Sequence, residues 1–155
     1  MPSRALPALV IVIALSAVTA CGGQDTLTHE ELVSKANEIC SEPVAQAQAI
    51  VSDPPDPTSG LDEAWVQELG EAAPLILTAA QGLASLDPPP EDEETYSDMV
   101  AAYESLADTM QNAADAAETG DEALVGQQIT GALAALQAAD AAATELGIEE
   151  CARAE

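Results

Sequence analysis

The chain has 155 residues, of which 28 are Asp or Glu and only 3 are Lys or Arg, so its formal net charge is -25 at pH 7. This length fits one domain rather than two, and the hydrophobic content of 48% argues against disorder throughout the chain. Nucleic acid and anionic lipid headgroups would both repel such a chain, which excludes nucleic-acid binding and electrostatic attachment to a membrane.

Residues 1–20 have the layout of an export signal. Arg4 supplies a positive charge near the start, residues 6–17 are almost unbroken apolar, and small residues follow up to Ala20. The apolar run is shorter than the about 20 residues that a membrane-spanning helix needs. The sequence therefore predicts a cleaved signal peptide, with an uncleaved signal-anchor as the alternative.

The end of this run, Val18-Thr19-Ala20-Cys21, resembles the lipobox of bacterial lipoproteins, in which an aliphatic residue and two small residues precede a Cys. The resemblance implies that a diacylglycerol alkylates Cys21 and that a peptidase cuts between Ala20 and Cys21. An ordinary cleavage site that happens to precede a Cys is the alternative. Two acyl chains would hold the protein at the bilayer, whereas one would bind only marginally. We expect a lipid-anchored protein on the extracytoplasmic face of the cell membrane.

Residues 21–27 are expected to form a short lipidated tether, and residues 28–155 an acidic helical domain. The first helix is predicted from Thr28 to about Val51, because Thr28 and Glu31 form a capping-box pattern and apolar residues then recur at helical spacing. Pro43 lies inside this segment and is expected to kink the helix.

The second helix is predicted over about 61–86, after Thr58 or Ser59 as its N-cap. Pro74 is expected to bend it or to divide it into two shorter helices. The third helix is predicted to begin near Pro90, since proline suits the first helical position. Its apolar positions alternate steps of three and four, which is typical of helical bundles; they include Tyr96, Met99, Tyr103, Leu106 and Met110.

The fourth helix is predicted from about Glu122 to Leu146, after a turn at 119–121, with Gly147 as its C-cap. Four helices with short connections favour an all-α, antiparallel up-down-up-down four-helix bundle. That topology places the start of the first helix near the end of the fourth.

Three Cys in an exported chain require an explanation. Lipidation would consume Cys21 and leave Cys40 and Cys151 as a pair in an oxidising compartment. The predicted topology brings the tail after Gly147 back towards the first helix, in agreement with a disulfide between these two Cys. Two separate buried thiols are the alternative.

No catalytic residue, metal site or cofactor is predicted. The single histidine, His29, cannot supply a His-rich metal site or a catalytic triad, and it is expected to be a solvated surface residue. Acidic residues open each predicted helix, where they complement the helix dipole. Weak Ca²⁺ binding by residues 91–94, or by Asp53 and Asp56, is the alternative interpretation of these acids, although no EF-hand spacing is present.

Residues 28–151 also look like a group of small exported lipoproteins of actinobacteria. The shared features are a Cys in the first helix (Cys40), a Pro-Pro-acidic junction (residues 88–92) and a Cys near the C-terminus within residues 147–151. This resemblance implies a lipid-anchored helical domain and no particular activity.

Two hypotheses about function follow. The first is a non-catalytic binding or structural module of the cell envelope, with an unknown protein or a cationic envelope ligand as its partner. The second is a helical module that carries a small apolar ligand or a metal and feeds an envelope transport system. A solid bundle core would favour the first hypothesis, and a lined pocket of about 300 Å³ or more would favour the second.

Overall fold

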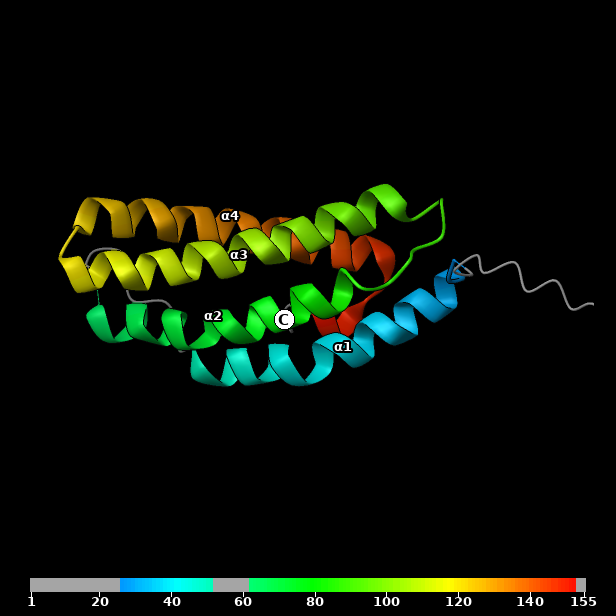
Figure 1. Ribbon diagram of the computed structural model, residues 1–155, viewed down its shortest axis with the longest axis horizontal. Coiled ribbons are helices and arrows are strands. Elements are labelled where there is room, and N and C mark those ends of the chain that lie inside the picture. Colours follow the sequence, from blue (N-terminus) through cyan, green and yellow to red (C-terminus); the bar gives the residue numbers. More distant parts are fainter. Residues whose placement is uncertain (1–25, 52–61, 153–155) are drawn as a thin grey trace, which may run out of the picture.

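The computed structural model describes residues 26–51 and 62–152 of the chain. Four helices, α1 (His29–Ile50), α2 (Glu63–Leu83), α3 (Glu93–Thr119) and α4 (Glu122–Leu146), are followed by a short 3-10 helix, η1 (Glu149–Cys151). Successive long helices run in opposite directions along one axis (Figure 1). The described part of the chain is therefore an all-α, up-down-up-down four-helix bundle, as the sequence predicts.

The ends of α1 and α4 lie where local signals predict them. Thr28 forms the predicted capping box: its hydroxyl accepts from the Glu31 backbone N–H, and the Glu31 carboxylate accepts from the Thr28 N–H at 3.0 Å. Gly147 ends α4 with φ of 73°, a conformation that glycine adopts without strain. The Ile148 N–H then donates to the Ala143 carbonyl at 2.9 Å, which completes a Schellman-type C-terminus.

Helix α2 begins at Glu63, close to the predicted start near residue 61, but the predicted N-cap is wrong, because Asp62 caps the helix in place of Thr58 or Ser59. The Asp62 carboxylate accepts from the backbone N–H groups of Ala64 and Trp65. A negatively charged acceptor at this position satisfies unpaired backbone donors and also complements the helix dipole. Thr58 and Ser59 lie outside the described residues.

The proline-rich junction between α2 and α3 is longer than the sequence predicts. Helix α2 ends at Leu83 rather than near Leu86, and α3 begins at Glu93 rather than near Pro90. Residues before prolines avoid the helical region, so consecutive prolines extend the connection. A turn in which the Asp92 N–H donates to the Pro89 carbonyl at 2.9 Å then leads into α3.

Pro43 and Pro74 both lie within continuous helices, so the alternative of two shorter helices in place of α2 is wrong. Each proline lacks the N–H that would bond to the preceding turn. Figure 1 shows that α1 changes direction part-way along its length. The bend lets α1 follow the side of the bundle.

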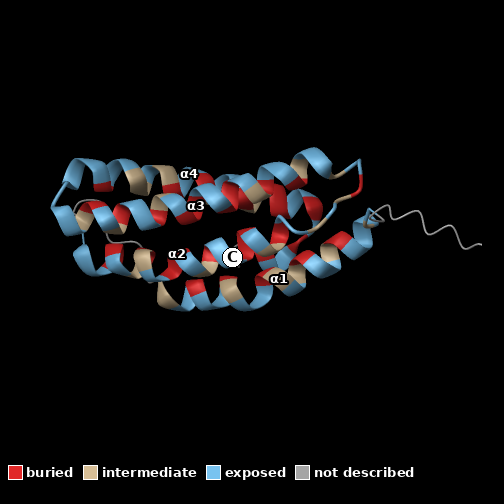
Figure 2. Ribbon diagram, in the orientation of Figure 1, coloured by how far each residue is buried: buried red, intermediate tan, exposed pale blue. Residues whose placement is uncertain are grey.

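Buried side chains line the inner sides of the helices, and exposed residues cover the outside (Figure 2). The core of the described residues holds many Ala, and no polar or charged side chain is buried in it. Small residues let the helices approach closely: a Cβ added at Gly70 of α2 would lie 2.7 Å from the Cβ of Ala114 of α3. Helices α2 and α3 therefore pack closely at this point.

Candidate functional site: an open apolar groove between the first and last helices

In the described part of the bundle, the first and last helices do not pack closely on each other. Helix α1 packs on α2, α2 on α3 and α3 on α4, whereas η1 contacts both α1 and α4. The tail thus lies between the first and last helices near one end of the bundle. Beyond η1, a groove of about 400 Å³ opens beside the half of α1 that leads to its C-terminus.

Four helices and η1 contribute to this groove. One wall is formed by α1 and the other by α4, and side chains of α2 and α3 form the floor. The principal apolar lining residues are Val44, Ala47, Val51, Trp65, Leu69, Ile76, Leu106, Met110, Ile129, Ala132, Leu133 and Leu136. Polar side-chain groups on the described lining residues come from Gln48, Tyr103, Asp140 and the indole N–H of Trp65. The surface of the groove is therefore mainly apolar, with few polar groups.

The tail is fixed at its end of the groove by a disulfide and by hydrogen bonds. Cys40 of α1 and Cys151 of η1 form the predicted disulfide, with a Cα–Cα distance of 5.2 Å. The Tyr103 hydroxyl donates to the Cys151 carbonyl, and the Glu150 N–H donates to the Asn37 side chain at 2.9 Å. Cys151 itself lines the groove. The covalent bond that joins the two ends of the domain therefore also defines one end of the candidate site.

Burial raises the pKa of the Tyr103 phenol well above its usual value, and the nearby negative charge of Asp140 raises it further. Asp140 is half-buried and lies on the same α4 face as Leu136. Asp140 is the last α4 residue in the lining, and α4 leads into η1, so the carboxylate lies towards the η1 end of the groove. The groove is thus asymmetric: it has an anionic group near one end and mainly apolar walls along the rest.

The remaining residues singled out from the sequence lie elsewhere. Ala20 and Cys21, the predicted cleavage and lipidation site, are outside the described residues. His29 is exposed, as predicted, but its Nδ1 atom lies 2.7 Å from an Asp92 carboxylate oxygen. This long-range contact ties the start of α1 to the start of α3, and no sequence signal indicated it.

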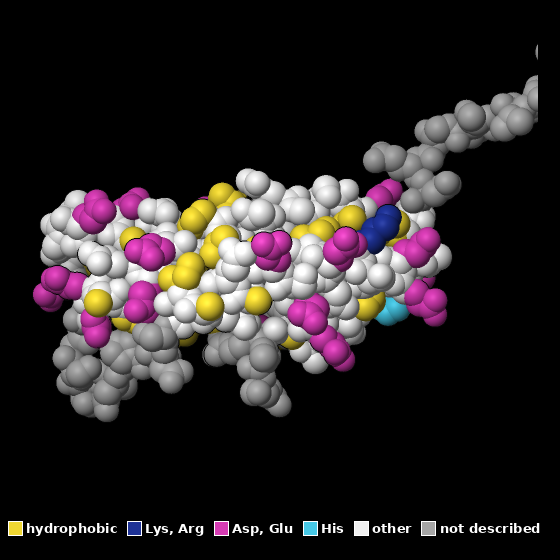
Figure 3. Space-filling model, turned by 90° about the horizontal axis from the view of Figure 1, so that it is seen from below, with side chains coloured by type: hydrophobic (Ala, Val, Ile, Leu, Met, Phe, Trp, Pro, Cys, Tyr) yellow, Lys and Arg dark blue, Asp and Glu magenta, His cyan; other side chains and the backbone are white. Residues whose placement is uncertain are grey.

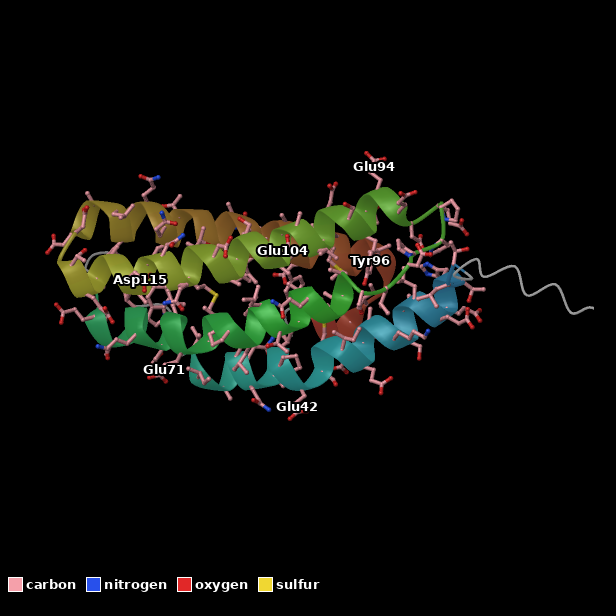
Figure 4. All side chains as sticks on the ribbon, in the orientation of Figure 1. Glu42, Glu71, Glu94, Tyr96, Glu104 and Asp115 are labelled. Carbon is pink, nitrogen blue, oxygen red and sulfur yellow. A yellow bond between two sulfur atoms is a disulfide. The ribbon has the colours of Figure 1, made fainter. Side chains whose placement is uncertain are left out.

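Most acidic side chains of the described residues are exposed on the outside of the bundle. Glu42 and Glu94 point away from it on opposite sides, whereas Tyr96 points inwards, where its hydroxyl donates to the Leu83 carbonyl at 2.8 Å (Figure 4). Figure 3 shows acidic groups spread along the whole face seen from below, with hydrophobic side chains between them. On the face that Figure 3 shows, the acidic groups are therefore dispersed rather than gathered in one patch.

Within residues 26–51 and 62–152, no three His, Cys, Asp or Glu side chains are grouped so that they could hold a metal ion. This finding covers residues 91–94, whereas Asp53 and Asp56 lie outside the described residues. The same part of the chain has no helix long and apolar enough to span a bilayer. Comparison with protein families, curated proteins and solved structures finds no match.

Sequence reasoning identified three lining residues of the groove, Tyr103, Leu106 and Met110, as inward-facing positions of the third helix, but it did not predict the groove. Their helical spacing indicates that they face inwards, and it does not indicate what faces them. The opening lies where α1 and α4 do not pack closely on each other and η1 contacts both, an arrangement of segments far apart in the sequence. The sequence feature that could have indicated this arrangement is Cys151, because its disulfide with Cys40 brings η1 against α1.

Proposed function

We propose that this protein is a lipid-anchored, extracytoplasmic carrier that binds a small apolar molecule in the groove between α1 and α4, without catalysing a reaction. The observation that supports this proposal is the size and lining of the groove. Ligand pockets in proteins typically measure about 300–1,000 Å³ and are mainly apolar with a few polar groups. The groove, at about 400 Å³, falls within this range, which favours the carrier over a structural module with a solid core.

The exposed rim of the groove also supports a binding role. Leu133, which lines the groove, is 48% exposed, so a bound ligand would remove apolar surface of this side chain from water. A ligand that covers apolar surface gains about 25 cal/mol for each Å² removed from water. The groove is therefore suited to binding that is driven mainly by the hydrophobic effect.

The proposed anchor would bring the groove close to a source of such ligands. The leader between Cys21 and the first helix spans at most about 20 Å at ~3.3 Å per residue. A domain held at that distance could take apolar molecules from the membrane and deliver them to an envelope transport system. Replacing Cys21 by Ser should release the protein into the medium, whereas continued membrane retention would indicate an uncleaved signal-anchor.

The chain's single Trp provides a direct binding assay. Trp65 lines the groove, so a neutral fluorescent probe such as N-phenyl-1-naphthylamine, once bound there, should accept excitation energy from it. We expect saturable energy transfer with one probe bound per chain. An apolar lipid or a neutral sterol that occupies the groove should displace the probe and restore Trp65 emission.

Matched variants on α4 assign the binding to the groove. Ala132 lines the groove, so Ala132→Phe should fill part of it and weaken probe binding at least about tenfold, the equivalent of ~1.4 kcal/mol. Ala134→Phe places the same side chain on an exposed site of the same helix and should leave binding unchanged. Equal affinity in both variants, or no saturable transfer in the wild type, would contradict the proposal.

A further inference from the structure

We infer that the ligand of the groove is a single unbranched alkyl or acyl chain of about a dozen carbons, which lies parallel to the helices. This inference rests on the proposed function and narrows the class of ligand. It concerns the shape of the groove, which can be tested separately from whether the groove binds apolar molecules at all.

The two walls of the groove each consist of one face of a helix. The lining residues recur at helical spacing on both walls; they are Ile129, Ala132, Leu133, Leu136 and Asp140 on α4, and Val44, Ala47, Gln48 and Val51 on or next to α1. Side chains at this spacing lie one above another along the helix axis. The groove is therefore a strip that follows the axis of the bundle over about two turns of α1 and about three turns of α4.

The antiparallel topology gives this strip two defined ends. The disulfide between Cys40 and Cys151 fixes η1 beside α1, and α1 leads away from it towards Val51. Helix α3 runs parallel to α1, whereas α2 and α4 run the opposite way (Figure 1). The lining residues farthest from η1 are therefore Val51, Trp65, Met110 and Ile129. A long molecule in the groove would lie with one end near Cys151 and the other end among these four side chains.

The length of the strip sets the length of the chain. Ile129 and Asp140 are eleven residues apart, so at about 1.5 Å per residue the lining of α4 extends ~16 Å. Trp65 and Ile76 on α2 are equally far apart. An extended alkyl chain advances about 1.3 Å per carbon, the projection of a C–C bond of ~1.5 Å on the chain axis. The strip therefore accommodates about a dozen carbons end to end.

The volume of the groove sets the number of chains. A methylene group fills a volume close to that of a water molecule in the liquid, ~30 Å³. The groove of about 400 Å³ therefore holds about 13 such groups, close to the number that its length accommodates in single file. A second chain beside the first would need about twice this volume, and a wide ring system would not fit the width of the strip. One extended chain therefore fills the groove.

A series of neutral 1-alkanols from octanol to tetradecanol tests the length, by competition with the neutral probe for the wild-type protein. The concentration for half-displacement should fall by about two- to fourfold for each added methylene that lies in the groove. It should stop falling near dodecanol, because further methylenes would extend into water. Affinity that still rises steadily up to tetradecanol, or that no longer rises beyond octanol, would overturn the inference.

Two pairs of neutral ligands test the shape. Cyclododecanol has the same number of carbons as dodecanol and should bind at least about tenfold more weakly, because much of the ring stays outside the strip. Monodecanoylglycerol and didecanoylglycerol distinguish a single free chain from a two-chain membrane lipid, and the second chain should not improve binding. If the probe binds but cyclododecanol equals dodecanol, or the two-chain lipid binds better, the inference fails while the carrier function stands. If neither the probe nor any alkanol binds, both fail.

Matched variants on α4 locate the chain. Ile129→Trp places a larger side chain at the end of the groove far from η1, so the alkanol series should stop gaining affinity at a chain shorter by about two carbons or more. Gln127→Trp adds the same side chain at an exposed position of α4 and should leave the series unchanged. Both variants are followed by direct excitation of the probe, and circular dichroism checks that they fold. The same limiting chain length in both folded variants would contradict the proposed position of the chain.

Discussion

Removing the Cys40–Cys151 disulfide is expected to destabilise the domain severely. The bond joins residues that are 111 positions apart, so it closes almost the whole described chain into one loop. In the chain-entropy model, a loop of this length contributes about 4–5 kcal/mol to the free energy of unfolding. The total free energy of unfolding of a domain is typically about 5–15 kcal/mol. We therefore expect Cys40→Ala with Cys151→Ala to lose at least about a quarter of the free energy of unfolding of the protein.

Two further effects act in the same direction. Both Cys are buried, at 0% and 2% exposed, so their replacement by Ala removes packed sulfur atoms from the core. Release of η1 also weakens the hydrogen bond between Tyr103 and the Cys151 carbonyl. With about 3–4 °C per kcal/mol for a domain of this size, the midpoint of thermal unfolding should fall on the order of 15 °C.

Urea unfolding followed by circular dichroism measures this loss. The oxidised wild type, the reduced wild type and the double variant are compared under the same conditions. Reduction alone should reproduce most of the decrease, because it opens the loop without changing the side-chain volume of the core. If the free energy of unfolding falls by less than about 1 kcal/mol in both the reduced wild type and the double variant, the reasoning is refuted, because the loop-entropy contribution would then be absent.

Three further predictions concern the charge, packing and buried tyrosines of the bundle. The thermal midpoint should rise with ionic strength because salt screens the repulsion among the acids, and an unchanged midpoint between dilute buffer and about 0.5 M salt would count against this. Gly126→Ala should stabilise α4 by up to about 1 kcal/mol, because the added Cβ has no atom within 4 Å. Gly70→Ala should destabilise the protein by about 1–3 kcal/mol, because the added Cβ would clash with Ala114, and a Gly70 variant that melts at or above the Gly126 variant would contradict this packing. Burial raises the pKa of both Tyr96 and Tyr103, so the stability that their protonated forms contribute is complete below about pH 10 and is lost as the pH rises towards the folded-state pKa. Phenolate absorbance should therefore appear together with loss of helicity. Phenolate formation near pH 10 in an intact bundle would be inconsistent with this burial.

Elements that depend on neighbouring residues could be predicted from the sequence. The hydrogen bonds of the capping box at Thr28 and of the left-handed glycines Gly120 and Gly147 join residues that are close in sequence. These helix ends therefore do not depend on how the helices pack. The N-cap of α2 was predicted wrongly because Thr58, Ser59 and Asp62 are all acceptable caps by local criteria. Only the position at which α2 can pack decides among them, and this position depends on the other helices.

The candidate site could be predicted only in part, for a related reason. Helical spacing indicates which residues face inwards, such as Trp65 and Met110, but not the separation of helices that are not neighbours in the chain. The groove lies where α1 and α4 do not pack closely on each other and η1 contacts both. The contact between His29 and Asp92 was missed in the same way, since 63 residues separate the two side chains in sequence.

The most direct test of a ligand site in the groove is methyl NMR of the protein labelled at the methionine methyl groups. The chain has three Met: Met110 lines the groove, Met99 is fully buried in the core, and Met1 lies in the predicted signal peptide. On titration with the neutral naphthylamine probe, we predict a saturable shift of the Met110 signal, caused by the aromatic ring, while the Met99 signal stays in place. A Met110 signal that does not move while the probe binds would place the ligand elsewhere and contradict the account.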